Sequence, residues 1–158
     1  VIVAEKELII KKNVFHKTEE LLYSYNKLKE YLLDETEYID MINRRTSGSV
    51  IKYSKDKPVI NEEQRIKDRV NSYELTKLQI ERLEKALNKI KTRTGYEVIE
   101  YRYLKENTKG EVFSYEEIAN ILAGQQNYNE DLNEKTVRRY KNILVREIAI
   151  CLFGVDAI

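Results

Sequence analysis

The stretch IKDRVNSYELTKLQIERLEKALNKI, residues 66–90, decides the fold class, because its apolar residues recur with the period of a helix. Two seven-residue series, offset by three, run through it: Ile66, Tyr73, Ile80 and Leu87, and then Thr76, Leu83 and Ile90. Such a pair of series is the a/d seam of a heptad repeat, which must face another helix. That partner is either an earlier helix of the same chain or the same helix of a second copy. Three heptads are short for a free-standing coiled coil, which favours the first alternative.

Composition extends the helical interpretation to the whole chain of 158 residues, which is long enough for one ordinary domain or two small ones. Five glycines, one proline and 35% charged residues are typical of a mostly helical protein, so we expect an all-α fold. The net charge of +1 argues neither for nor against an anionic partner, and any such argument must be local.

The chain is expected to be soluble and cytoplasmic, because no run of about 20 apolar residues could span a bilayer and the lone Cys151 excludes an intramolecular disulfide. The opening VIVAEKELIIKK carries charges within its apolar run, so a secretory signal is not expected. The first residue is Val1, which suggests that a few residues precede it or were removed.

An earlier helix supplies a possible partner for the seam. Thr18 is placed as its N-cap, with Glu19 and Glu20 in the first turn, where acids favour the helix dipole. An apolar stripe follows at helical spacing and extends toward Ile42: Leu21, Tyr25, Leu28 and Leu32. The pattern fails over about residues 44–61, which contain SGS and the only proline, Pro58. We therefore predict an N-terminal helical hairpin over residues 1–91, with an irregular connection at about 44–61.

Residues 92–158 carry three further helical patterns. The KTRTG turn ends the seam, and a short apolar pattern follows over Val98 to Leu104. Ser114 and Glu117 satisfy the S-x-x-E capping box, which opens a helix through Leu122. The polar run 123–133 is a loop by composition, and Asn133 is a natural N-cap for the last helix. Two short helices, the second of them capped, followed by a basic helix are the parts of a helix-turn-helix domain.

The last helix has two contrasting faces. Successive residues of a helix are rotated by about 100° around its axis. By this rotation, one face about 100° wide carries basic and amide side chains: Lys135, Arg138, Arg139, Asn142 and Arg146. The opposite sector is apolar: Val137, Tyr140, Leu144, Ile148 and Cys151. Solvated helix faces usually interleave acids with bases, yet no acid occurs between Lys135 and Arg146. Arginine and asparagine make paired hydrogen bonds to guanine and adenine in the major groove, so the sequence favours contact with double-stranded DNA.

Three segments, EVIEYRYLKE, FSYEEIANIL and NEKTVRRYKNIL, resemble the region-four DNA-binding domain of bacterial sigma factors. From Lys17 to the end, the chain is similar to phage-encoded, sigma-factor-like regulators of the ArpU and RinA type, in which motifs like KTEELLYSYNKLK and LFG recur. The resemblance implies a transcription regulator of late phage genes, acting in the bacterial cytoplasm at promoters and touching RNA polymerase. It assigns DNA contact to the exposed residues of the last helix, with Lys141 and Arg146 nearer the DNA backbone: Lys135, Arg138, Arg139, Lys141, Asn142 and Arg146. Thr136 could also touch phosphate at the helix N-terminus, where free N–H groups favour anions.

The chain departs from that family in one connection, which has eleven residues, 123–133, where helix-turn-helix connections usually have three or four. The loop could offer Gln125, Gln126 and Asn127 to DNA, but it contains no cation, and we expect it to be disordered. Glu134 could accept from a cytosine amine or merely favour the helix dipole.

Catalysis is not expected, because His16 is the only histidine, no metal-ligand cluster or phosphate-binding glycine loop occurs, and paired acids sit at helix starts. No enzyme activity, metal or cofactor is therefore predicted. Two other functions stay open. One is a DNA-packaging protein like a small terminase subunit, which would oligomerise through the seam. The other is a helical adaptor whose basic helix meets an acidic protein.

Overall fold

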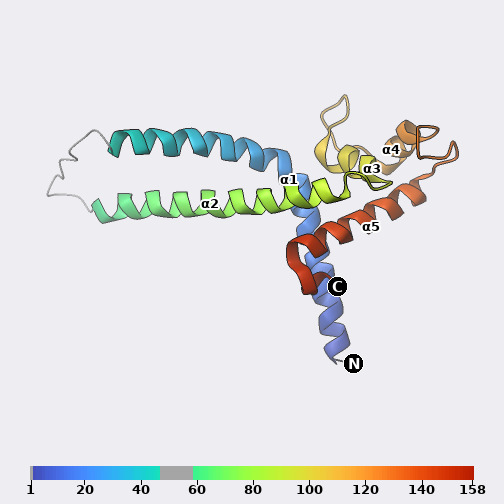
Figure 1. Ribbon diagram of the computed structural model, residues 1–158, viewed down its shortest axis with the longest axis horizontal. Helices are drawn as coiled ribbons and strands as arrows, with labels where there is room; N and C mark the ends of the chain where they lie inside the picture. Colours follow the sequence, from blue (N-terminus) through green and yellow to red (C-terminus); the bar gives the residue numbers. More distant parts are fainter. Residues whose placement is uncertain (1, 47–58) are drawn as a thin grey trace. The chain divides into compact units, whose positions relative to one another are not determined.

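The structure is a computed structural model that describes residues 2–46 and 59–158, and these residues form an all-α fold (Figure 1). The elements are α1 (Ile2–Thr46), α2 (Val59–Ile90), α3 (Tyr96–Ile99), the π-helical turn η1 (Glu100–Leu104), α4 (Tyr115–Leu122), α5 (Glu134–Phe153) and the 3₁₀ turn η2 (Gly154–Ala157). Within the described residues no strand forms, and the single β-bridge joins Glu106 to Val112. The predicted fold class is confirmed. Most of the predicted connection at about 44–61 lies outside the described residues.

Two compact units make up the chain, and both long helices contribute to each. One unit contains Val1–Tyr25 and Arg82–Ile158, and the other contains Asn26–Glu81. This division differs from the predicted boundary at 91/92, because the first half of α1 and the end of α2 pack against α5. The segment that carries the basic helix is therefore larger than residues 92–158.

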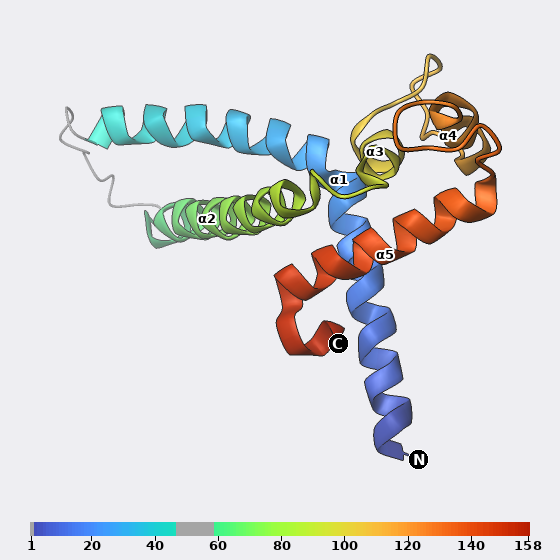
Figure 2. The same cartoon turned by 45° about the vertical axis from the view of Figure 1, so that its right-hand side comes forward.

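In the Asn26–Glu81 unit, α1 and α2 run side by side in opposite directions (Figures 1 and 2). Arg69 donates to both carboxylate oxygens of Glu35 at 2.7 Å, and its guanidinium lies 3.4 Å from the ring centroid of Tyr38. The paired hydrogen bonds to Arg69 hold the pKa of the Glu35 carboxyl below its usual value. The hydroxyls of Thr36 and Tyr73 are 2.9 Å apart. Contacts between α1 and α2 thus include polar pairs as well as the apolar seam.

The start predicted for the first helix is wrong. α1 begins at Ile2, and Thr18 lies in its interior, fully buried, where its hydroxyl donates to the carbonyl of Val14 at 2.8 Å. A threonine that satisfies its own hydroxyl on the preceding turn can sit inside a helix. The sequence Thr-Glu-Glu has the composition of a helix start, but tertiary contacts of the preceding turns extend the helix beyond it.

The larger core of the first unit joins four elements around α5. Leu22 of α1, Leu83 of α2 and Ile99 of α3 are fully buried and pack in one cluster with the inner face of α5, together with further residues of α2, η1 and α5: Ala86, Leu87, Ile90, Tyr103, Leu144, Val145 and Ile148. The predicted seam residues Leu83, Leu87 and Ile90 are therefore buried, as their spacing indicates. This core fixes which side of α5 faces outward.

A second, smaller cluster holds α4 against the start of α5. It consists of Val98, Ile118, Ala119, Leu122 and Val137, all buried. The predicted Ser114 cap is present, since its hydroxyl oxygen accepts from the backbone N–H of Glu117 at 3.1 Å. None of the helices in the described part of the chain is long and apolar enough to cross a membrane.

Candidate nucleic-acid interface

α5 begins as its sequence predicts. The side-chain oxygen of Asn133 accepts from the backbone N–H of Thr136 at 3.0 Å and from the Thr136 hydroxyl at 3.1 Å, which is an N-cap. Thr136 is half-buried and lines a depression with Asn127, Tyr128 and Tyr140. The structure therefore separates Thr136 from the other predicted DNA contacts, because its hydroxyl is engaged in the cap.

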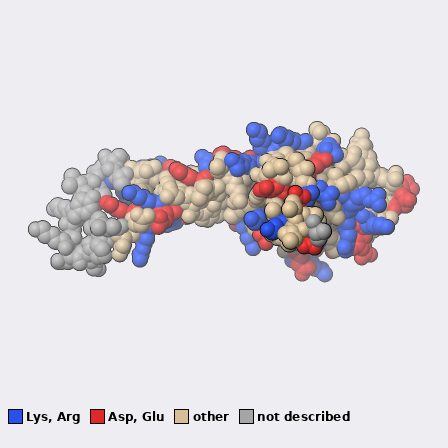
Figure 3. All heavy atoms as spheres, turned by 90° about the horizontal axis from the view of Figure 1, so that it is seen from below, with Lys and Arg blue, Asp and Glu red and all other residues tan. Residues whose placement is uncertain are grey.

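Five of the predicted contacts lie together on the outer side of α5, and we call them the basic face: Lys135, Arg138, Arg139, Asn142 and Arg146. All five are exposed and line one shallow depression, which the exposed Ile143 also lines. Figure 3 shows many Lys and Arg side chains on the right-hand part of the view, with Asp and Glu side chains among them. The helical spacing of these residues thus places their side chains together on one side of α5, as predicted.

Arg138 is the one member of the basic face with an ion pair to its own helix. Its guanidinium lies 2.6 Å from a carboxylate oxygen of Glu134 and 4.9 Å from the ring centroid of Tyr115. Both side chains of the ion pair are exposed, and such pairs contribute little stability in water. Glu134 therefore orients Arg138, and breaking this pair would cost the fold little.

Lys141 lies away from the basic face. Its side chain is only 11% exposed, and its ammonium sits 3.7 Å from a carboxylate oxygen of Glu19 in α1. The rings of Phe15 and Tyr115 flank it, at 5.3 and 5.7 Å from their centroids. The assignment of Lys141 to DNA contact conflicts with this placement, because at 100° per residue it falls on the side of α5 that faces α1.

Glu19 also anchors the inner side of the unit. The buried Tyr103 donates its hydroxyl to the same oxygen, Oε2, at 2.7 Å. Burial, together with this hydrogen bond, raises the pKa of Tyr103 far above its ordinary value, so the phenol stays protonated as the donor. One carboxylate of α1 thus joins η1 to α5 at residues outside the basic face.

Arg102 performs a similar structural role between η1 and the start of α4. It donates to the carbonyl of Phe113 at 2.7 Å and to the hydroxyl of Tyr23 at 3.1 Å. Its guanidinium lies 4.2 Å from the ring centroid of Tyr115. Sequence reasoning gave Arg102 no role, because an arginine on a short helix has no local signal for partners far away in the chain.

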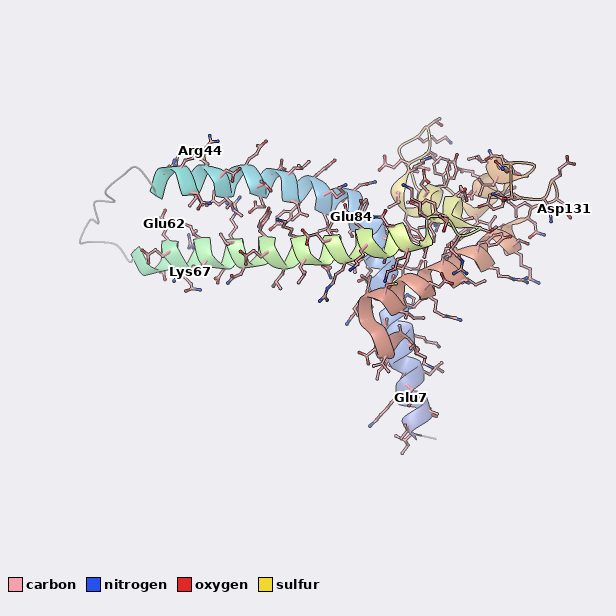
Figure 4. All side chains as sticks on the ribbon, in the orientation of Figure 1. Glu7, Arg44, Glu62, Lys67, Glu84 and Asp131 are labelled. Carbon is pink, nitrogen blue, oxygen red and sulfur yellow. The ribbon has the colours of Figure 1, made fainter. Side chains whose placement is uncertain are left out.

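The α4–α5 connection, which includes Asp131 (Figure 4), is organised by turns, and the expectation of disorder is wrong. The backbone N–H of Gly124 donates to Asn129, and that of Tyr128 donates to Gln125. The Gln125 side chain donates to the carbonyl of Ile121 at 2.7 Å, so its amide N–H is engaged within the protein. Tyr128 and Leu132 are partly buried against the smaller core, which gives the loop an apolar anchor.

Tyr128 is the main residue that sequence reasoning missed. Its hydroxyl accepts from the backbone N–H of Gly95 at 3.1 Å and donates to a carboxylate oxygen of Glu97. Its ring meets that of Tyr140 edge to face, with centroids 6.0 Å apart. Burial and the Glu97 hydrogen bond raise the pKa of Tyr128. The side chain fastens the loop to the turn before α3 and to the inner side of α5.

The apolar back of α5 follows the prediction at its start and departs from it at its end. Val137, Leu144 and Ile148 are buried, but Cys151 is exposed. In the last turns the buried stripe rotates toward Ala149, because Ala149 packs against Val14 of α1. The prediction of a buried Cys151 is wrong for that reason.

Metal binding finds no support in residues 2–46 and 59–158, where no group of three or more His, Cys, Asp or Glu could hold an ion. Comparisons with protein-family models, with curated proteins and with solved structures found no match.

Proposed function

We propose that the chain is a sequence-specific DNA-binding transcription regulator that inserts α5 into the major groove. The observation that carries the proposal is the basic face itself, a depression on one exposed helix side that is lined by four cations, one amide and Ile143, with Glu134 paired to Arg138 beside it. A B-DNA major groove admits a single helix with phosphates on both of its sides, so a stripe of this kind suits it.

Binding would have two components. The exposed cations neutralise phosphates, which gives affinity that falls with salt and sets the position of the helix. Arg138, Arg139 and Asn142 are the residues best suited to read bases, because their side chains form paired hydrogen bonds with guanine or adenine. The rigid packing behind them, through Glu19, Tyr103 and Lys141, holds α5 in one orientation.

The resemblance to sigma region four and to ArpU- and RinA-type regulators supports the same proposal and extends it. It adds action at late phage promoters in the bacterial cytoplasm and contact with RNA polymerase. These extensions rest on the resemblance alone, whereas DNA contact rests on the placement of the basic face as well.

The test is selection from a random-sequence duplex pool at two salt concentrations, followed by sequencing. An enriched motif supports a regulator that reads sequence. Salt-sensitive binding without a motif would favour a packaging role, and no binding at either salt would favour an adaptor.

A double substitution tests whether the basic face is the surface that binds DNA. Arg138→Ala with Arg139→Ala is expected to remove about 2–6 kcal/mol of specific binding, at about 1–3 kcal/mol for each base-reading side chain. Arg65→Ala with Arg82→Ala is the matched control, because both arginines are exposed on α2 and the change in net charge is the same. Unchanged binding by a folded Arg138/Arg139 variant would refute the assigned face.

A further inference from the structure

The depression of the basic face adjoins a cavity that the first helix also lines. This cavity between the N-terminal half of α1 and α5 has an apolar part and five polar lining residues, which are Lys11, Lys12 and His16 of α1 and Asn142 and Arg146 of α5. The last two also line the depression of the basic face. The depression of the basic face and the cavity beside α1 therefore adjoin at Asn142 and Arg146, and each has exposed cations in its lining.

Contacts on both sides of the cavity fix α1 against α5. Val14 is 7% exposed and packs with Ala149 and Ala157, which are also buried. Further along the helix, Thr18 is fully buried and Glu19 lies 3.7 Å from the ammonium of Lys141. Lys12 and His16 thus project from a helix whose position is set by its neighbours in the fold.

No Asp or Glu side chain lines this cavity, and its three Lys and Arg side chains, Lys11, Lys12 and Arg146, are exposed, as is His16. The remaining lining residues besides Asn142 are apolar: Leu8, Val14, Phe15, Ala149, Ala157 and Ile158. Acids begin one turn before Lys11, at Glu7 (Figure 4), which borders a different cavity with Asp156. Lys11 borders both cavities, whereas Lys12 borders only the first of these two.

We propose that Lys11 and Lys12, with His16 beside them, bind the phosphate backbone of the same duplex whose major groove receives α5. This inference rests on the proposed function. Phosphates flank a helix in the major groove, and Lys11 and Lys12 line the same cavity as Asn142 and Arg146 of the basic face. Ammonium groups neutralise phosphate without reading sequence, so α1 supplies affinity and orientation while α5 supplies specificity.

The test compares two variants of the full chain on one helix. Lys11→Gln with Lys12→Gln removes the proposed phosphate-binding groups. Lys6→Gln with Lys17→Gln is the matched control, because it removes the same charge from exposed lysines on the opposite side of α1, outside the cavity. Dissociation constants are measured over a range of salt with the selected duplex, or with a random 30-base-pair duplex if selection yields no motif. Helix content by circular dichroism verifies that both variants fold.

The Lys11/Lys12 variant is expected to lower the slope of log K against log salt by about 0.9 for each phosphate that is no longer neutralised, that is by about 0.9–1.8. The control variant should keep the slope of the unmodified chain, and neither should change the selected motif. Equal slopes for all three proteins would overturn phosphate binding by α1 while leaving DNA binding by α5 intact. Loss of the motif in the Lys11/Lys12 variant would overturn a purely phosphate role. No binding by the unmodified chain would overturn both the role of α1 and the proposed function.

Discussion

Substitution of Gly95 by alanine should destabilise the unit that carries α5, for two separable reasons. Gly95 has φ +97°, in the left-handed region, where a side chain costs about 1–2 kcal/mol. A Cβ at this position would also lie 2.8 Å from Cδ1 of Tyr140 and 2.9 Å from its Cβ and Cγ. The Cβ and Cγ atoms cannot swing aside as the tip of a side chain can, so the ring or the backbone must move.

The second cost is of the overpacking kind, about 1–3 kcal/mol. Together the two effects predict a loss of about 2–5 kcal/mol in the free energy of unfolding. At a urea m value of about 2 kcal/mol/M, the midpoint falls by about 1–2.5 M. The loss should be followed by circular dichroism and by the near-ultraviolet signal of the tyrosines, since the chain has no tryptophan.

Gly110→Ala is the matched control. Gly110 has φ +74°, also left-handed, but a Cβ there would meet only a carboxylate oxygen of Glu106 at 3.9 Å. It should therefore lose only the backbone part, about 1–2 kcal/mol. If the two glycine variants lose the same stability, the close approach to Tyr140 has no energetic effect. A Gly95→Ala variant as stable as the unmodified protein would refute both parts.

Three further substitutions test the packing around the candidate interface and in the Asn26–Glu81 unit. Tyr128→Phe should cost about 1–3 kcal/mol of stability, because its loop loses hydrogen bonds to two partners; chemical denaturation measures the loss, and no change would contradict the fastening role. The lowered pKa of Glu35 means that its pair with Arg69 stabilises the fold above the unfolded-state value of about 4.5, and that this stability is lost as pH falls toward the lower folded value. Unfolding titrations from pH 7 to pH 3 should show this loss in the unmodified chain and a smaller one in Arg69→Gln; equal pH dependence would argue against the pair. Lys141→Met should leave the salt dependence of DNA binding unchanged and alter stability instead, because its ammonium faces Glu19, whereas a fall of about 0.9 in the salt slope would return Lys141 to the DNA surface.

Features that depend on a few adjacent residues could be predicted from the sequence. The Asn133 and Ser114 caps form because each side chain reaches a backbone N–H three residues ahead, which requires no distant partner. The basic face follows in the same way from the helical period, since the angular position of Arg139 on α5 depends only on its place in the chain. The burial of Leu83 and Ile90 follows from the seam.

Features that depend on distant partners could not be predicted. Lys141 and Arg138 are both cations in the same basic segment of α5, but only Lys141 contacts α1. Its partner there is Glu19, which lies more than a hundred positions earlier in the chain. Tyr128 lies in a polar run that is typical of a loop, and its partners Gly95 and Glu97 precede it by about thirty residues. Cys151 has the spacing of a buried residue, yet the packing of Ala149 on α1 turns it outward.

The first half of α1 and α5 belong to one compact unit, and this affects the free energy of the DNA binding that we propose. A basic arm that becomes ordered only on DNA loses conformational entropy at that moment, which reduces the affinity that its cations add. Here Thr18 is fully buried and Val14 packs on Ala149, so the helix that carries Lys12 is held against α5 before any DNA arrives. The phosphate binding that we propose for α1 would then require ordering of the lysine side chains alone. The same packing explains why the first half of α1 belongs to the unit of the basic face and is not an extension that lacks contacts with it. If both helices bind DNA as we propose, their packing would set the orientation of the unit on the duplex.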